Sequence, residues 1–427
     1  MSPKHLTEKS PLAAWLQAIE TCHPAEIELG LERMREVANR LPLNLDQSIK
    51  VVVGGTNGKG TSIRLMEAIL IEAGFSVATY TSPHFLHYNE RITLSGTQVD
   101  DDMICLAFSQ IESQRQGVPL TYFEFGTLAA LLIFSQQKPD ILLLEVGLGG
   151  RLDSVNIVDS DIALITTIAL DHIEWLGPDR ESIGFEKAGI FRSNCPAVCG
   201  DPDAPQSLIK HAQALNTKLY CNGRDYSYSQ TSSDSWLWKG IDVKGHELVL
   251  KSLPIPHVPI QNAAAVLQLL QCINLSISIE HIVNGIIKAQ LTGRMQLGKI
   301  SGYPCVLDVA HNPESASYLA NYIKIHKHGK VHLVLGMLAD KDLTKVCEAL
   351  LSVVDYWHLV TLHTPRGATA SQLKAVLESL GVTDTSMTEY ASAESALTNI
   401  PNVMDAMSQI VIAGSFYTVS QALNKIQ

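Results

Sequence analysis

The sequence lacks several features that would place it in common classes of protein. Its 427 residues contain no run approaching the roughly 20 apolar residues that cross a membrane, and its first residues offer no apolar core long enough for a signal peptide. Lysine and arginine number 32 against 43 aspartates and glutamates, a formal net charge of -11. A broad basic face for nucleic acid is therefore not expected, and we expect neither nucleic acid nor a membrane among the partners.

Paired cysteines are also missing. The eight cysteines are scattered, and the closest two, Cys195 and Cys199, have neither CxxC spacing nor a second pair that would complete a zinc site. This pattern is typical of reduced, buried thiols in a cytoplasmic protein. A content of 46% hydrophobic and 18% charged residues argues against wholesale disorder, and the length favours two or three domains.

Apolar runs alternate with helical patterns in the first half of the chain. Residues 49–55, 140–150 and 161–172 are aliphatic runs that end in glycine or polar residues, and residues 61–74 carry a helical pattern. Strands that are apolar throughout and alternate with helices indicate a parallel, doubly wound sheet with both faces covered. Ligands bind such sheets at the carboxyl ends of the strands.

The pattern changes twice further along the chain. Residues 201–256 are polar and rich in turn residues, which predicts a small antiparallel β insertion. A second α/β series follows, with apolar strands near residues 303–309, 331–338, 357–362 and 408–415. We expect an α/β protein in which residues 1–293 form a domain on a P-loop-type, mostly parallel sheet. Residues 298–427 would form a smaller, Rossmann-like α/β domain.

The segment GGTNGKGT, residues 54–61, lies between a predicted strand and a predicted helix. The Walker pattern needs four residues between its glycines and Ser or Thr directly after lysine. Here three residues separate the glycines, and a further glycine follows Lys59. The context of strand, glycine turn and helix is nevertheless that of a phosphate-binding loop. Backbone N–H groups of residues 55–60 would bind phosphate oxygens, Lys59 would add charge, and Thr61 would add a hydroxyl.

Two polar residues follow the ends of other apolar strands. Glu145 ends ILLLE, where a buried carboxylate is costly unless it is paired or binds a cation. Mg2+ commonly takes carboxylates together with phosphate oxygens. His172 alone is more typical of a structural histidine, since imidazole is an uncommon Mg2+ ligand. With Glu145 on a neighbouring strand end, a metal-binding role is favoured.

Three other segments carry polar groups whose roles stay open from the residues alone. Lys187, in FEKAGIF, has the setting of a solvated surface lysine. The segment 84–96 has two histidines and Arg91 in a predicted loop, which fits either a loop that covers a ligand or plain surface. Asp308 and His311 follow a strand of the second domain and would line a cleft if the two domains face each other.

Together these motifs resemble the folylpolyglutamate synthase/dihydrofolate synthase family of the Mur-type amide ligases. The matching stretches run in unbroken order from about residue 49 to 315 and include GGTNGKGT, TSPH, TYFEFGT, LEVGLGGRLDSVNIVD, FEKAGIF, QNAAAV, TGR and DVAHNPES. The extra glycine after Lys59 is this family's form of the loop. The resemblance implies an ATP- and Mg2+-dependent ligase that converts a pterin carboxylate to an acyl phosphate, which the amine of L-glutamate then attacks.

The resemblance also implies roles for individual residues. The expected catalytic residues are Lys59, Lys187 and His311, with Lys187 as an N-carbamate. The expected Mg2+ ligands are Ser82, Glu145 and His172, with Thr61 beside them. Carbamylated Lys187 is expected to supply a carboxylate-like ligand for a second cation, and a monovalent cation is a further candidate. The expected ATP contacts are Gly55, Thr56, Asn57, Gly58, Lys59, Gly60, Thr61, Asn262, Arg294 and Asp308.

The segment TYFEFGT and Asp153 resemble the dihydropteroate-binding part of bifunctional members. Thr121, Phe123 and Asp153 are therefore the expected pterin contacts, although Ser154 stands where close bifunctional relatives tend to have alanine. We expect a cytoplasmic monomer that makes dihydrofolate from dihydropteroate and L-glutamate and then lengthens the glutamate tail of reduced folates. A monofunctional folylpolyglutamate synthase is the alternative.

Other classes of protein explain less of the sequence. A peptidoglycan Mur ligase shares the mechanism but normally has an extra domain before the phosphate loop, whereas Lys59 comes early. A P-loop kinase would account for the loop and Glu145 but not for DVAHNPES or the second domain. A non-catalytic nucleotide-binding module would tend to have lost some of the expected cation ligands.

Overall fold

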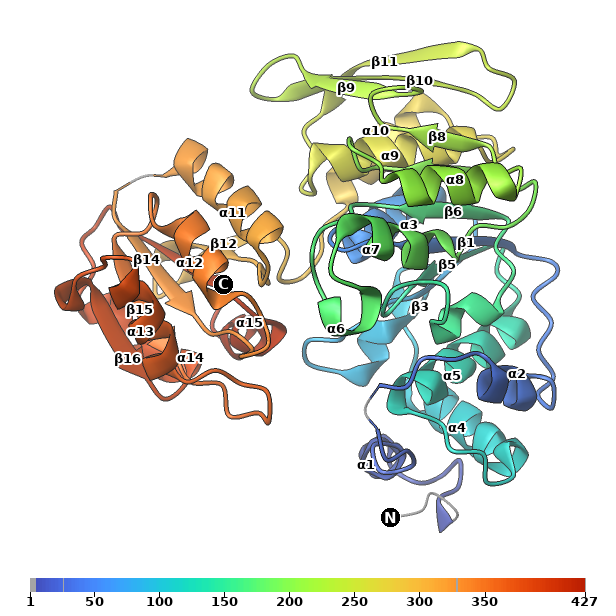
Figure 1. The fold of residues 1–427 in the computed structure, drawn as a ribbon, viewed down its shortest axis with the longest axis horizontal. Coiled ribbons are helices and arrows are strands. Elements are labelled where there is room, and N and C mark those ends of the chain that lie inside the picture. Colours follow the sequence, from blue (N-terminus) through green and yellow to red (C-terminus); the bar gives the residue numbers. More distant parts are fainter. Residues whose placement is uncertain (1–4, 26, 328, 427) are drawn as a thin grey trace. The chain divides into compact units, whose positions relative to one another are not determined.

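The protein is represented by a computed structural model that describes residues 5–25, 27–327 and 329–426. The chain divides into two units, residues 1–289 and 290–427. Each unit is built around its own β-sheet (Figure 1). No helix in the described part of the chain is long and apolar enough to cross a membrane.

The first unit contains an eight-stranded sheet in the order β4-β3-β2-β5-β1-β6-β7-β8. The strands are β1 Ile49–Gly54, β2 Val77–Tyr80, β3 Ile92–Leu94, β4 Thr97–Gln98, β5 Ile141–Glu145, β6 Ile162–Ile165, β7 Ala197–Cys199 and β8 Leu219–Cys221. In this spatial order, β2, β5, β1, β6, β7 and β8 are each parallel to the next. Strands β3 and β4 form an antiparallel edge beside β2. The predicted doubly wound, mostly parallel sheet is confirmed.

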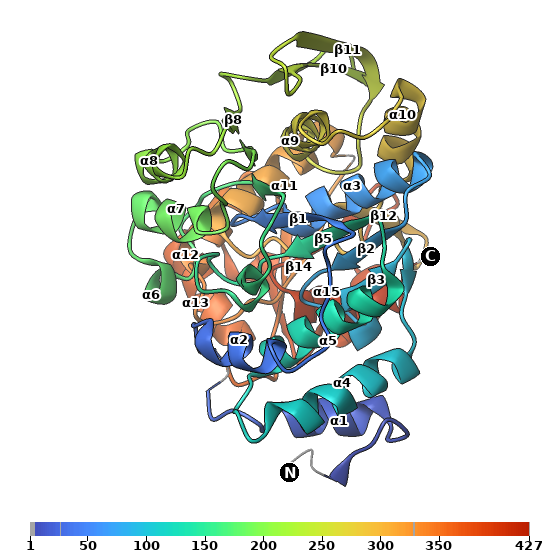
Figure 2. The same cartoon turned by 90° about the vertical axis from the view of Figure 1, so that its right-hand side faces the viewer.

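Helices cover both faces of this sheet. They are α1 Leu12–Ile19, α2 Glu32–Ala38, α3 Lys59–Glu72, α4 Asp101–Arg115, α5 Tyr122–Gln137, α6 Ile173–Leu176, α7 Arg180–Ala188, α8 Gln206–Ala214, α9 Ile260–Gln271 and α10 Ile279–Lys288. Successive strand residues point to opposite faces. Accordingly, Val51 and Val53 share a core with α3, α9 and α10, whereas Val52 belongs to the core on the other face. Figure 2 shows α3 and α9 on one side of β1 and β5, and α5, α4 and α1 on the other.

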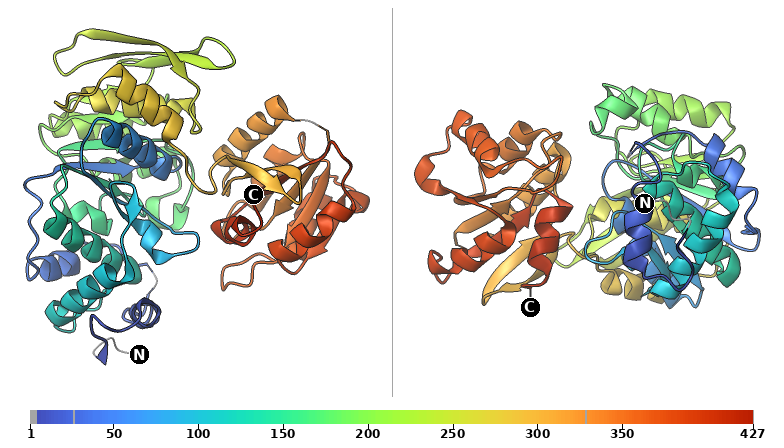
Figure 3. Two further views of the ribbon diagram at one scale, coloured as in Figure 1. Left: turned by 180° about the vertical axis from the view of Figure 1, so that it is seen from behind. Right: turned by 90° about the horizontal axis from the view of Figure 1, so that it is seen from below.

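The antiparallel insertion is smaller than the sequence pattern predicted. It consists of β9 Ser227–Gln230, β10 Ser235–Ile241 and β11 Glu247–Pro254, in the order β11-β10-β9. Figure 3 shows it above α9 in the left view, and the indole Nε1 of buried Trp238 donates to the carbonyl of Ala264 on α9 (3.0 Å). The prediction was wrong for residues 206–221, which form α8 and β8 and extend the large sheet. Leu208 and Ala212 give α8 an apolar face that its polar surroundings obscure in the sequence.

The second unit contains a six-stranded sheet in the order β12-β13-β17-β14-β15-β16. Its strands are β12 Gln296–Ile300, β13 Tyr303–Leu307, β14 Val331–Leu335, β15 Tyr356–Val360, β16 Met387–Tyr390 and β17 Gln409–Ala413, and its α-helices are α11 Pro313–His326, α12 Leu343–Leu350, α13 Ala370–Ser379, α14 Ala393–Asn399 and α15 Phe416–Leu423. Only β12 is antiparallel among the described strands of this sheet. The predicted α/β character is confirmed. The edge strands β12 and β16 were missed because QLGKI and MTEY lack a continuous apolar run.

Two histidines lie inside the sheet of the second unit. His332 on β14 and His358 on β15 are both buried, and Nδ1 of His332 lies 3.0 Å from Nε2 of His358. Burial, and then the charge of His332, lowers the pKa of His358 to about 3. Burial also lowers the pKa of His332, against the opposing charges of Asp405 and Asp355. At neutral pH the fold therefore holds two neutral imidazoles.

We predict that the second unit loses stability as the pH falls below the ordinary histidine pKa. The unfolded chain takes up a proton at His358 near pH 6.5, whereas the fold resists protonation until about pH 3. The stabilisation by the neutral ring is therefore present above about pH 6.5 and is lost on acidification. Between pH 6.5 and pH 5 the loss for His358 should be about 2 kcal/mol.

The measurement is urea unfolding at pH 7 and pH 5, followed by the reaction of buried Cys347 in α12 with dithiodipyridine. Cys105, which is buried in α4 of the first unit, corrects for the effect of pH on thiol reactivity. His358→Leu should weaken the pH dependence at Cys347. An unchanged pH dependence in that variant would contradict the prediction.

Candidate active site

The glycine-rich loop predicted at residues 54–61 connects β1 to α3. Strand β1 lies between β5 and β6, so the loop is flanked by the carboxyl ends of both. Helix α3 begins at Lys59, two residues before the predicted start, and Thr61 lies in its first turn. The first turn of a helix directs its N–H groups outward, and the helix dipole there favours anions.

Two glycines of the loop have no space for a side chain. Gly55 has a φ of 142°, and a Cβ atom there would lie 1.9 Å from Oγ1 of Thr166. Gly58 has a φ of 86°, and a Cβ atom there would lie 2.4 Å from Nδ2 of Asn262. Both the backbone conformation and the close neighbours therefore require glycine.

Two threonines that follow β6 hold the loop in place. Oγ1 of Thr166 donates to the carbonyl of Asn57 (2.6 Å), and Oγ1 of Thr167 accepts from the N–H of Asn57 (3.1 Å). The N–H of Thr56 donates to the carbonyl of Thr167 (2.7 Å). Sequence reasoning missed both threonines. The available signal was a pair of hydroxyl residues directly after the apolar strand, in ALITT.

Lys59, Thr61 and Asn262 lie together at this loop. Nζ of Lys59 donates to two carbonyl groups of the loop, at 3.1 and 3.2 Å. Oγ1 of Thr61 donates to the carbonyl of Gly58 (2.8 Å) and accepts from Nδ2 of Asn262 (2.9 Å). Asn262 is buried on α9, so a residue that is distant in sequence fixes the hydroxyl in the first turn of α3.

Glu145 and Ser82 meet at the adjacent strand. Glu145 is the buried last residue of β5, and its Oε2 accepts the N–H of Ser82 (3.0 Å), which follows β2. Ser82, which also carries a hydroxyl, and the Glu145 carboxylate thus lie together beside the glycine-rich loop. Oxygen ligands of these two kinds are those that Mg2+ prefers.

His172 lies on the other side of the loop. The expectation that Glu145 and His172 follow neighbouring strands is wrong, because β1 separates β5 from β6. His172 has a φ of 51° and precedes α6, and its Nε2 lies 3.9 Å from Oδ2 of Asp171. The described residues contain no group of three or more His, Cys, Asp or Glu side chains that could hold a metal. The expected ligand set includes only two residues of those types.

Lys187 is buried, contrary to the interpretation from its sequence setting. It lies near the end of α7 with 3% of its surface exposed. Burial, and secondarily the charge of Lys59, lowers the pKa of Lys187 to about 7, against the opposing charges of Asp171 and Asp153. A large fraction of the amine is therefore neutral at neutral pH, and a neutral lysine amine is a nucleophile.

Phe123 and Asp153 both lie against the glycine-rich segment that follows β5. The Phe123 ring is so close to Gly147 that a Cβ atom there would lie 2.6 Å from Cζ. Oδ2 of Asp153 accepts the N–H of Leu148 (2.8 Å). Burial raises the pKa of Asp153 to about 6, against hydrogen bonds from three backbone N–H groups. The ring of Tyr80 lies 5.9 Å from that of Phe123, between centroids.

Thr121 and Ser154 have structural partners beside this group. Oγ1 of Thr121 accepts the N–H of Glu124 (3.2 Å) and caps α5, while the Glu124 carboxylate accepts the N–H of Thr121 (2.8 Å). Nε of Arg33 lies 2.9 Å from the same carboxylate. Oγ of Ser154 lies 2.9 Å from Oγ1 of Thr127. The side chain of Thr121 thus positions the start of the helix that carries Phe123.

Arg294, Asp308 and His311 belong to the second unit. Arg294 lies over the ring of Phe416, 5.0 Å from its centroid. Oδ2 of Asp308 accepts the N–H of Met295 (2.9 Å), and burial raises the pKa of this carboxyl against the nearby charge of Arg294. Nδ1 of His311 lies 2.9 Å from a backbone carbonyl two residues before it. The segment after β13 therefore carries a carboxyl group, on Asp308, and an imidazole, on His311, only three residues apart.

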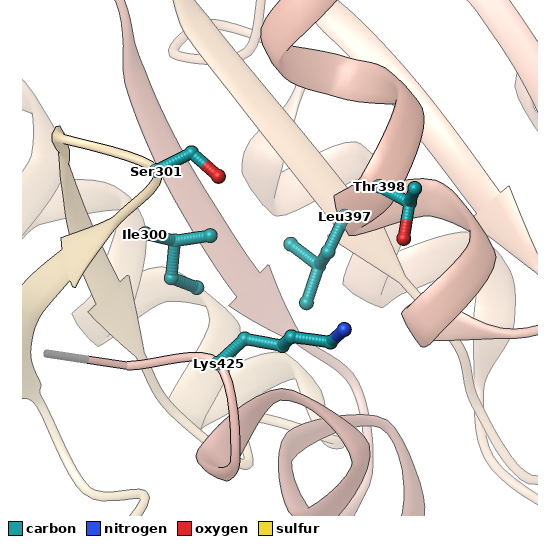
Figure 4. A pocket seen from close by; sticks show the side chains of 5 residues that line it. All are labelled: Ile300, Ser301, Leu397, Thr398 and Lys425. Atoms are coloured by element: carbon teal, nitrogen blue, oxygen red, sulfur yellow. The ribbon is translucent and has the colours of Figure 1, made fainter.

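The second unit also contains a cavity of about 300 Å³. It is lined by Ile300, Ser301, Leu397, Thr398 and Lys425 (Figure 4). Nζ of Lys425 lies 3.5 Å from a carboxylate oxygen of Glu394. The lining includes none of the predicted site residues.

Known families match both units of the chain. The family model for the Mur ligase middle domain matches residues 53–270, and the model for the Mur ligase glutamate ligase domain matches residues 293–416. The first match alone spans more than half of the chain.

Individual relatives match nearly the full length. A dihydrofolate synthase/folylpolyglutamate synthase of Escherichia coli (strain K12) is 45% identical over 421 residues, which are 98% of this chain and 96% of the relative. The structure of E. coli FolC in complex with DHPP and ADP has a TM-score of 0.92 at 43% identity and covers 98% of both chains. A bifunctional folylpolyglutamate synthase/dihydrofolate synthase from Yersinia pestis, complexed with AMPPNP and Mn ion, has a TM-score of 0.90 at 44% identity, again over 98% of both chains. The chain belongs to the dihydrofolate synthase/folylpolyglutamate synthase family of Mur ligases.

Proposed function

We propose that this protein is an ATP-dependent ligase that joins L-glutamate to dihydropteroate, forming dihydrofolate, and to reduced folates, lengthening their glutamate tails. The observation that carries the proposal is the assembly of the phosphate loop and Glu145 at adjacent strand ends of one sheet, with Asn262 of α9 hydrogen-bonded to Thr61 in the first turn of α3. The substrates follow from relatives that bind DHPP and ADP in one structure and Mn, AMPPNP and L-glutamate in another.

The reaction proceeds in two steps. A carboxylate oxygen of the pterin substrate attacks the γ-phosphorus of ATP. ADP is the leaving group, and the pterin substrate becomes an acyl phosphate. The amine of L-glutamate attacks the acyl carbon, and the tetrahedral intermediate collapses to the amide with loss of phosphate. Phosphoryl transfer of this kind depends on positioning and charge neutralisation. Lys59 would exchange its loop carbonyls for phosphate oxygens, and the loop N–H groups from Gly55 to Thr61 would bind the rest of the triphosphate.

The donors beside the loop fit a divalent cation, for which we propose Mg2+. Ser82, Glu145 and His172 would hold it, a carbamate on Lys187 would supply a ligand for a second cation, and a monovalent cation would be an additional occupant. The fit rests on the buried Glu145 carboxylate next to Ser82 and on the reactive amine of Lys187. When bound, the cation neutralises charge on the phosphates that react.

The pterin would bind beside Thr121, Phe123 and Asp153. Phe123 offers an aromatic face for stacking. With its pKa at about 6, Asp153 can exchange a proton with a ligand near neutral pH, and buried carboxyls of this kind are typical of functional sites. Because Thr121 caps α5, its contribution would come through the position of Phe123.

We further propose residues 1–293 as the ATP-binding central domain and residues 298–427 as the glutamate-ligase domain. Arg294 and Asp308 would contact ATP, and His311 would take part in catalysis. The match to the first family model ends at residue 270 and the match to the second begins at residue 293, which supports this division. The proposed enzyme is a cytoplasmic monomer, and all eight of its cysteines are free thiols, as in a reducing compartment.

The central prediction is phosphate release with two different acceptors. Purified protein with ATP, Mg2+ and L-glutamate should release phosphate when either dihydropteroate or tetrahydrofolate is added. Release with tetrahydrofolate alone would indicate a monofunctional enzyme and would remove the support for the dihydropteroate contacts. If neither acceptor gives phosphate release in protein that still binds ATP, the substrate is that of another Mur-type ligase.

Gly58→Ala should abolish tight nucleotide binding, because the new methyl group would collide with Asn262. Gly74→Ala is the matched control, since Gly74 has a φ of 87° against 86° for Gly58 but no neighbouring atom within 4 Å. Both variants should lose about 1 kcal/mol of stability through backbone strain. Only Gly58→Ala should weaken binding of AMPPNP in calorimetry. Equal affinities in the two variants would show that the contact with Asn262 is dispensable.

Lys187 should form a carbamate with dissolved CO2. Its neutral amine is about half populated at pH 7, since its pKa is about 7. Incubation with 13C-bicarbonate should therefore give a carbamate signal in 13C NMR spectra that is larger at pH 8 than at pH 6. The signal should be absent from Lys187→Met, and this variant should lose ligase activity. An active Lys187→Met protein would remove Lys187 from the catalytic residues.

A further inference from the structure

The segment from Thr81 to Arg91 contains the polar residues that the proposed function leaves without a role. The segment is a loop closed on itself, because the N–H of Thr81 donates to the carbonyl of Arg91 (2.9 Å). Inside it, the Glu90 carboxylate accepts the N–H groups of three successive residues, 85–87, at 2.7 Å each. These bonds give the loop a defined shape and engage both oxygens of the Glu90 carboxylate within the loop.

Arg91 is buried among uncharged groups. It is 8% exposed, and its guanidinium lies 5.4 and 5.6 Å from the ring centroids of Tyr88 and Tyr122. Its Nε donates to Nδ1 of His84 (2.9 Å), which as an acceptor carries no proton. Within the described ranges of the chain, no carboxylate oxygen lies within 4.0 Å of the guanidinium nitrogens. The positive charge of Arg91 is therefore buried without a counter-ion from the protein.

The other buried arginine of the described chain shows the usual arrangement. Arg115 is 6% exposed, its Nε lies 2.5 Å from Oε2 of Glu112, and its Nη1 donates to the carbonyl of Val118 (2.9 Å). Burial of a charge is costly unless a counter-charge and hydrogen bonds compensate for it. Arg115 has that compensation, whereas Arg91 has aromatic faces, one imidazole and the hydroxyl of Tyr80, none of which carries a negative charge. Buried charges that are poorly compensated by the fold are typical of ligand-binding sites.

Arg91 is connected to both candidate binding regions. The residue after Thr81 is Ser82, whose N–H donates to Glu145 (3.0 Å), so the loop closure places the Arg91 backbone next to the proposed cation ligands. On the other side, Arg91 neighbours the hydroxyl of Tyr80, whose ring lies 5.9 Å from that of Phe123. Dihydropteroate carries its pterin at one end and its carboxylate at the other. A substrate with its pterin at Phe123 and its carboxylate directed towards the phosphate loop would bring that carboxylate to Arg91.

We propose that Arg91 binds the carboxylate of the pterin substrate and orients the oxygen that attacks ATP. This inference rests on the proposed function. A guanidinium pairs with a carboxylate through two parallel hydrogen bonds, which fixes the orientation of the carboxylate as well as its position. His84 is a positioning residue, because its bond to Nε fixes the orientation of the guanidinium.

The test compares two ligands that share the pterin ring. Dihydropteroate has the carboxylate, and 6-hydroxymethyl-7,8-dihydropterin does not. Binding of each to the full chain is measured by calorimetry with AMPPNP and Mg2+ present. Arg91→Met should weaken dihydropteroate binding by at least about 10-fold, the worth of a charge-assisted pair. Its affinities for the hydroxymethyl pterin and for AMPPNP should stay within about 2-fold of the original protein, since neither ligand pairs a carboxylate with Arg91.

Thermal unfolding without ligand separates this role from a structural one. Arg91→Met removes a buried charge that no protein carboxylate compensates, although it also loses the His84 hydrogen bond and the contacts with two tyrosine rings, so its Tm should fall less than that of a variant that breaks a buried ion pair. Arg115→Met is the matched control, and its Tm should fall because it leaves Glu112 unpaired.

Two results would overturn the inference while leaving the proposed function intact. These are unchanged dihydropteroate affinity in Arg91→Met, and an equal loss of affinity for both pterins, which would assign Arg91 to the pterin ring or to the fold. Failure of the original protein to bind dihydropteroate while it binds AMPPNP would instead overturn the proposed acceptor substrate, and the Arg91 assignment with it.

Discussion

The close approach of the glycine-rich loop, residues 54–61, to its neighbours is the constraint on which the candidate site depends. Thr166 and Asn262 contact the loop so closely that neither Gly55 nor Gly58 could carry a side chain. The same two neighbours supply hydrogen bonds that set the loop's shape. They come from the end of β6 and from α9, far along the chain, so the loop acquires its shape only when the whole first unit has folded. Loop geometry and fold stability are therefore coupled.

Buried charge is the second theme of the first unit. Asp153 and Lys187 are buried without an opposite charge close enough to compensate fully, and their pKa values move towards neutrality, to about 6 and about 7. Arg91, which cannot lose its proton, lies among tyrosine rings instead. A fold optimised for stability alone would pair such groups, as it pairs Arg115 with Glu112. Poorly compensated buried charges of this kind are typical of a site for charged ligands.

The sequence predicted those features that depend on residues close together in the chain. Continuous apolar runs identified the parallel sheet, and the glycine spacing around Lys59 identified the loop. The edge strands β12 and β16 escaped because an edge strand needs only one apolar face. The burial of Lys187 and the isolation of Arg91 escaped because they depend on which helices and rings surround a side chain, and no local pattern records that. Thr166 was visible in the sequence, but only its contact with the loop gives it a role.

Carbamylation would change the electrostatics of the site beyond the addition of a cation ligand. In the unmodified protein Lys59 and Lys187 repel each other, which is one cause of the lowered pKa of Lys187. A carbamate would replace the positive charge of Lys187 by a negative one, so the interaction with Lys59 would become attractive. Lys59 would then face an anion at Lys187 before any nucleotide arrives, and the incoming phosphates would meet a lysine whose charge is already partly neutralised. The cation held by the carbamate would restore the positive charge that the phosphates need. Nucleotide and cation would therefore bind most favourably together, because each compensates the charge that the other leaves.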